Sequence, residues 1–238
     1  MPRCRLCHEE RELRNSHIVP EFLYGDLYND KRQLMGINGQ GNKGWRPLQK
    51  GIREHLFCES CEQFFNEHCE KPFRAQWVVQ SPLPKPWDVA EPHWVNVEYS
   101  SFKLFHLSVL FRASVTHLPT FGQVSLGPHE EHLRKMILAK DPGEPWRYPV
   151  AGLVVLHHTT RMPVSMVSQA QQGRLAGIRC YAIIYGGVQW WIGVASQRCT
   201  EFESMALRAD GSLPLASVPW NELGVMKSAS RMLRNAET

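Results

Sequence analysis

Two short cysteine motifs decide the fold near the start of the chain: Cys4-Arg5-Leu6-Cys7 and Leu56-Phe57-Cys58-Glu59-Ser60-Cys61. Two residues between paired cysteines let both thiolates turn toward one cation, and two such pairs complete a tetrahedral site of the kind that zinc prefers. The motifs therefore predict a structural zinc ion bound by Cys4, Cys7, Cys58 and Cys61. The alternative, free cysteines that only pack in a core, requires the same spacing to arise twice by chance.

The composition is that of a folded protein with a mildly basic charge. The chain has 238 residues, of which 43% are hydrophobic and 21% charged, and its formal net charge is +4. This apolar fraction is sufficient for a buried core and excludes an intrinsically disordered chain. The charge is compatible with a nucleic-acid partner without demanding one.

The cellular setting is expected to be the reducing cytoplasm. The first residues are polar and contain no apolar signal-peptide core, and no apolar run approaches the roughly 18 residues of a membrane span. We therefore expect no membrane partner. Cysteines in that compartment serve as metal ligands or core thiols rather than disulfides, and the unpaired Cys69, Cys180 and Cys199 are expected in the core.

A histidine motif lies between the two cysteine pairs, Asn15-Ser16-His17-Ile18-Val19-Pro20. The order of three features resembles the HNH, or ββα-metal, nucleases. These features are a first CxxC, a strand with a polar residue, His, an apolar pair and Pro, and a Leu-x-Cys-x-x-Cys motif that opens a helix. The resemblance covers about residues 4–72 and nothing beyond.

The resemblance implies roles for His17 and for residues of the helix after the second cysteine pair. His17 occupies the position of the general base that takes a proton from the attacking water, a task that suits an imidazole near neutral pH. Glu62 directly follows Cys61, at the position of a residue that helps hold a catalytic Mg²⁺ or Mn²⁺ ion. Asn66 lies one helical turn later on the same face, and His68 is a weaker candidate.

Ser16 departs from the family pattern. The family often has Asp, Glu or His before the catalytic histidine, and a neutral hydroxyl is a poor ligand for a hard cation. Either Asn15 or His8 compensates, or the metal binds weakly until DNA phosphate joins it, or the site is inactive. The alternative role for His17 is a histidine that packs beside the zinc site.

The segment between the cysteine pairs is basic and rich in glycine. Residues 31–53 contain no Asp or Glu, and such a backbone with cations suits contact with a phosphate chain. The predicted DNA-binding residues are Lys31, Arg32, Lys43, Arg46, Lys50 and Arg53. A solvated basic loop is the alternative.

The rest of the chain predicts an α+β architecture. We expect a nuclease module over residues 1–75, a proline-rich linker over 76–95, and a domain of helices and antiparallel sheet over 96–238. Periodicity predicts a helix over 103–115 with Leu104, Leu107, Phe111 and Val115 on one face, and a second beginning at Gly127-Pro128. Strands are expected over 150–156, 178–185 and 188–194, with Gly186-Gly187 as a hairpin turn and Trp190 and Trp191 on opposite faces. A final helix is expected over 221–232.

These observations predict a metal-dependent DNA endonuclease of the HNH type. By analogy with the family, we expect an effector of anti-phage defence or restriction, controlled by a partner protein or by homo-oligomerisation. The rival hypothesis is a non-catalytic zinc ribbon that binds nucleic acid or protein. A redox protein is disfavoured because a thioredoxin-type motif needs one CxxC in a βαβ context.

Overall fold

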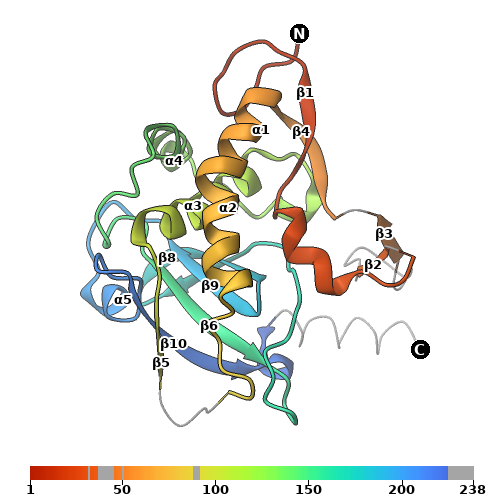
Figure 1. Cartoon of the computed structure of the whole chain (residues 1–238). Helices are drawn as coiled ribbons and strands as arrows, with labels where there is room; N and C mark the ends of the chain where they lie inside the picture. The colour runs from red at the N-terminus through yellow and green to blue at the C-terminus, as the bar shows by residue number, and fades with distance from the viewer. Residues whose placement is uncertain (32, 37–45, 50, 88–91, 225–238) are drawn as a thin grey trace, which may run out of the picture.

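The computed structural model describes residues 1–31, 33–36, 46–49, 51–87 and 92–224. It is a mixed α+β structure, as predicted, with one six-stranded sheet and two separate two-stranded ribbons. The ribbon nearest the N-terminus lies away from the large sheet, and a long helical segment runs from one to the other (Figure 1).

The N-terminal part has the order strand, strand, helix. Strand β1 (Leu13–His17) pairs antiparallel with β4 (Arg53–Cys58), and α1 (Glu59–Phe65) begins directly after β4. In the register, Leu13 faces Cys58 at one end of this ribbon and His17 faces Arg53 at the other. Between the strands lie a 3₁₀ segment (Glu21–Leu27) and a small ribbon of β2 (Gln33–Gly36) and β3 (Arg46–Gln49).

The helix after β4 continues well beyond α1. Wider π-type turns (Asn66–Glu70 and Arg74–Val79) flank α2 (Lys71–Phe73), so that helical backbone extends to Val79. Pro72 lies in this stretch and has no N–H to donate. A proline inside a helix disturbs the regular hydrogen-bond ladder, and wider turns are one way to accommodate the ring.

The large sheet has the strand order β5-β10-β6-β9-β8-β7. Its strands are β5 (His93–Asn96), β6 (Val150–Leu156), β7 (Gln171–Leu175), β8 (Ile178–Tyr185), β9 (Val188–Gly193) and β10 (Ser212–Pro219). The pairings are antiparallel as expected, except that β10 runs parallel to β6. The predicted hairpin joins β8 to β9, and Gly186 and Gly187 both have the positive φ that such a turn requires.

Helix α3 (Tyr99–Val115) is the central element of the core. It packs against α2, β9 and α4 (Pro128–Ala139), whereas the short α5 (Thr200–Ser204) lies elsewhere. The four residues predicted to share one face of α3 are all buried, and burial extends around the helix, because every residue from 102 to 113 is buried. A helix apolar on most sides belongs inside a protein rather than on its surface.

One hydrophobic core extends across the predicted linker. It includes side chains from Cys4 to Leu215. Phe73 stacks on Phe105 with ring centroids 3.8 Å apart, and the Trp77 indole donates a hydrogen bond to the Gly186 carbonyl at 2.8 Å. The boundary over residues 76–95 stays a prediction, and the two parts on either side share this core.

Two further expectations concern the C-terminal part. Trp190 is fully buried, whereas Trp191 is only half-buried and packs on a second small cluster with Phe202. The helix expected over 221–232 lies largely outside the described residues.

Lys103 is a buried cation in α3. Its ammonium donates to the Glu144 carbonyl at 2.7 Å and to the Tyr99 hydroxyl at 3.0 Å. Burial lowers the pKa of Lys103 to about 7, against the opposing charges of Asp141 and Glu144. Because the unfolded chain keeps this proton up to a pKa near 10.5, it binds more protons than the folded chain between these values.

The folded state should therefore gain stability as the pH rises through this window. We expect the unfolding free energy of the wild type to rise relative to that of Lys103→Met by roughly 2–3 kcal/mol between about pH 7 and about pH 9.5. Urea unfolding of both proteins at both pH values measures it. The same pH dependence of the unfolding free energy in both proteins would contradict a lowered pKa of Lys103.

Gly211, which directly precedes β10, lies beside Val97 at the end of β5, at a point with no room for a side chain. Its φ is +85°, and a Cβ there would lie 2.0 Å from the Val97 carbonyl oxygen. We expect Gly211→Ala to lower the unfolding free energy by about 3 kcal/mol or more, through both clash and backbone strain. Gly177→Ala is the matched control, because Gly177 has a φ of +75° with open space around it, and should cost only about 1 kcal/mol. Equal losses in denaturant unfolding would contradict the steric account.

Candidate metal centre and neighbouring site

The four predicted cysteines meet at one point. The Sγ atoms of Cys4, Cys7, Cys58 and Cys61 all lie within 4.8 Å of one another. Cys4 and Cys7 come from the first loop, Cys58 ends β4, and Cys61 lies in the first turn of α1. Four thiols at this separation can hold one metal ion, so the cluster fastens the N-terminal loop to the junction of ribbon and helix.

Backbone groups of the two loops stabilise this arrangement. The Arg5 N–H donates to the Leu56 carbonyl at 3.0 Å, and the Cys58 N–H donates to the Cys4 sulfur at 3.4 Å. The chain then turns back at His8, which has a φ of +64° and donates its N–H to the Cys4 carbonyl at 3.0 Å. An N–H directed at sulfur favours the thiolate, which is the form that binds metal.

The thiols influence one another's ionisation. A hydrogen bond from the Cys61 thiol lowers the pKa of Cys4 to about 4, although burial opposes this. The same hydrogen bond raises the pKa of Cys61, and burial raises the pKa of Cys7. One thiolate is thus favoured even without metal, and a cation would favour ionisation of the others.

The first cysteine loop is also attached to α4. Arg134 donates to the Leu6 carbonyl at 2.7 Å and forms an ion pair with Glu131 at 2.6 Å. The metal centre is therefore packed against the C-terminal part of the chain as well as against its own ribbon.

His17 lies at the end of the ribbon opposite to Cys58. Its side chain is 18% exposed, and its Nε2 atom lies 3.9 Å from a carboxylate oxygen of Glu21. Gly51 approaches the ring closely, since a Cβ at that position would lie 3.4 Å from the His17 Cδ2 atom and 3.1 Å from Tyr24. The imidazole is therefore closely packed on one side but partly accessible to solvent.

Glu62 is a half-buried carboxyl on α1. Its Oε1 atom is buried and has no hydrogen-bond partner among the described residues. Burial raises the pKa of Glu62, which Arg112 and the Ser16 hydroxyl oppose. A buried carboxyl oxygen without a hydrogen-bond partner is of the chemical kind that can bind a hard cation.

Asn66 is exposed, one turn further along, at the start of the π-type segment. Apart from the four cysteines, no group of three or more His, Cys, Asp or Glu side chains in the described ranges is close enough to hold a metal. A Mg²⁺ ion usually binds to one or two carboxylates, with substrate phosphate and water completing its shell. The described residues therefore show no complete site for a cation besides the cysteine cluster.

Ser16 has a structural role in the ribbon. It is 1% exposed, and its hydroxyl accepts a hydrogen bond from the Phe57 N–H at 3.3 Å and donates to the Arg14 carbonyl at 3.2 Å. Of the two suggested substitutes as metal ligand, Asn15 is exposed and faces His55 across the ribbon, and His8 lies in the first cysteine loop.

The predicted DNA-binding residues are described only in part. Lys31 is exposed, and Arg53 is half-buried on β4 directly opposite His17. Arg46 lies in β3, but its side chain is outside the described part, as are Arg32, Lys43 and Lys50. The basic surface therefore stays a prediction.

Arg112 and Glu70 take part in this site and were not predicted from the sequence. The Arg112 guanidinium, which is buried, pairs with Glu70 at 2.6 Å and donates to the His17 carbonyl at 3.3 Å. In the sequence, this ion pair was indicated only by an arginine inside the apolar run of α3, because a buried cation needs a partner.

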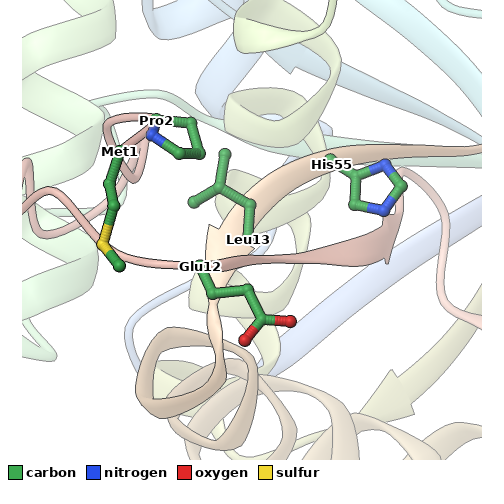
Figure 2. A pocket seen from close by; sticks show the side chains of 5 residues that line it. All are labelled: Met1, Pro2, Glu12, Leu13 and His55. Carbon is green, nitrogen blue, oxygen red and sulfur yellow. The ribbon is translucent and has the colours of Figure 1, made fainter.

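A shallow hollow lies beside the ribbon, away from these residues. Figure 2 shows it lined by Met1, Pro2, Glu12, Leu13 and His55. None of the predicted catalytic residues lines it. His55 is exposed there, on the strand next to His17.

Two of the three remaining cysteines lie in the core, as expected. Cys69 and Cys180 are buried, and burial raises the pKa of each thiol, to about 12 and about 11 respectively. Cys199 is only partly buried. His129 hydrogen-bonds with the Tyr148 hydroxyl at 2.9 Å.

No helix in the described ranges is both long and apolar enough to cross a membrane. Comparisons with protein-family models, with curated protein sequences and with solved structures find no match to this chain.

Proposed function

We propose that this protein is a metal-dependent DNA endonuclease of the HNH type. The observation that carries the proposal is the β1-β4-α1 unit: four thiols join its ribbon to its helix, His17 ends its first strand, and Glu62 follows the last cysteine. This is the order of elements and chemical groups that the family resemblance implies.

Zinc is the metal we propose for the cysteine cluster. Four thiolates in a tetrahedral set select zinc or iron, and a closed site with no free position suits a structural zinc ion. Its role is to hold the first loop against β4 and α1, so that the ribbon keeps His17 in place.

The proposed reaction is hydrolysis of a phosphodiester bond. His17 takes a proton from the attacking water through its imidazole, and Glu62, with Asn66 beside it, supplies oxygen ligands for the catalytic cation. Mg²⁺ or Mn²⁺, when bound, neutralises the charge that develops on the phosphate and the leaving oxygen. Lys31 and Arg53 are the described members of the basic set that would contact DNA.

The wider role rests on analogy with the family. We propose a cytoplasmic effector of anti-phage defence or restriction, held in check by a partner protein or by homo-oligomerisation. Full activity of the isolated monomer on any DNA would argue against such control.

Plasmid cleavage tests the proposed activity. The full chain, isolated with its zinc, is incubated with supercoiled plasmid and Mg²⁺ or Mn²⁺, and nicked and linear products are separated on a gel. Cleavage that requires added Mg²⁺ or Mn²⁺, in protein that keeps its bound zinc, would support the proposal. Binding of the plasmid without cleavage would favour the second candidate.

The second candidate is a non-catalytic zinc ribbon that binds nucleic acid or protein. The observation that favours it is Ser16, whose hydroxyl is engaged with the Phe57 N–H and the Arg14 carbonyl at the position where the family often has a metal ligand. Such a module would retain zinc and bind its partner equally well without His17.

A further inference from the structure

Arg112 connects two parts of the chain that the sequence places far apart. It belongs to α3, yet its guanidinium donates through one terminal nitrogen to the His17 carbonyl at 3.3 Å and through the other to Glu70 at 2.6 Å. Its face lies over the Phe65 ring, 4.3 Å from the centroid. Strand β1, the helix after β4 and helix α3 therefore meet at this one side chain.

Arg112 is buried, so its polar contacts must replace hydrogen bonds to water. Its side chain is 2% exposed, and its Nε atom has no partner among the described residues. A buried guanidinium is costly unless its donors are used, and the two terminal nitrogens of Arg112 each reach an acceptor from a different segment. Lysine, with a single nitrogen, cannot reproduce this geometry.

We propose that Arg112 is the positioning residue of the nuclease site: through the His17 carbonyl and Glu70 it fixes the end of β1 against the helix that carries Glu62. This inference rests on the proposed function. It means that the catalytic site is completed by α3 and is not confined to residues 1–75.

The kinetic test compares Arg112→Lys with the wild type in the full chain. The variant retains the positive charge, so the folded state should persist, but it cannot bridge both acceptors. We expect kcat for plasmid cleavage to fall roughly 100-fold with KM nearly unchanged, because displacing the His17 imidazole slows the chemical step more than it weakens DNA binding. Arg112→Met should lose at least as much.

Lys103→Met is the matched control. It removes another buried cation from the same helix, whose contacts are with Tyr99 and the Glu144 carbonyl rather than with the ribbon. We expect wild-type kcat in this variant. A folded, zinc-loaded Arg112→Lys protein with wild-type kcat would overturn the proposal.

A second readout does not depend on activity. The ring resonances of His17, assigned from their absence in His17→Ala, should move in the NMR spectrum of Arg112→Lys and stay in place in Lys103→Met. If the wild type cuts no DNA, the proposed nuclease function fails, and these spectra still decide whether Arg112 positions His17. Unchanged His17 resonances in Arg112→Lys would reject that role.

Discussion

Cys61→Ala is expected to release the metal ion and to cause the largest loss of stability of any substitution considered for this chain. Cys61 lies in the first turn of α1 and its sulfur is within 4.8 Å of the other three, so its loss leaves an incomplete ligand set. Because the metal site forms only in the folded chain, binding free energy becomes folding free energy, about 10–16 kcal/mol in zinc-finger peptides.

We expect one zinc per chain in the wild type and none in Cys61→Ala, with a fall in Tm of roughly 10–20 °C or more. Elemental analysis and thermal unfolding measure both quantities. Cys180→Ala is the control, because Cys180 is equally buried but lies in β8, outside the cluster. Full zinc content in Cys61→Ala, or equal loss in both variants, would contradict a four-cysteine site.

His17→Ala is expected to slow DNA cleavage strongly without loss of zinc. The imidazole lies at the end of β1 and is 18% exposed. His17 is not a member of the cysteine cluster. General-base catalysis contributes about 10²–10⁴-fold to a rate, so cleavage should fall by at least two orders of magnitude. DNA binding, measured by a gel shift, should change little.

His55→Ala is the control for that experiment. His55 is an exposed histidine on β4, the strand paired with β1, and it faces Asn15. Its removal should leave cleavage intact, with the same zinc content as in the wild type. If the two alanine variants cut equally well, His17 is not the base and the proposed mechanism fails.

Local patterns predicted much of this structure. The paired cysteines were identified because two-residue spacing fixes the geometry of a metal loop. The hairpin at Gly186-Gly187 and the helix beginning at Pro128 followed from backbone preferences that act over a few residues.

What could not be predicted depends on contacts between distant segments. The stripe of Leu104, Leu107, Phe111 and Val115 indicated one buried face of α3, but Phe102, Phe105 and Val109 fill the other sides because sheet and helices surround it. The pairing of Arg112 with Glu70 joins residues 42 positions apart and has no local signature. The role of Ser16 likewise depends on Phe57, across the ribbon.

The cation dependence of plasmid cleavage by the zinc-loaded full chain tests the central claim most directly. The account predicts that supercoiled plasmid is nicked or cut only when Mg²⁺ or Mn²⁺ is added, and that one zinc per chain remains bound throughout. A zinc-loaded, folded protein that binds DNA but cuts none with any divalent cation would contradict the nuclease assignment and leave a zinc-ribbon binding module.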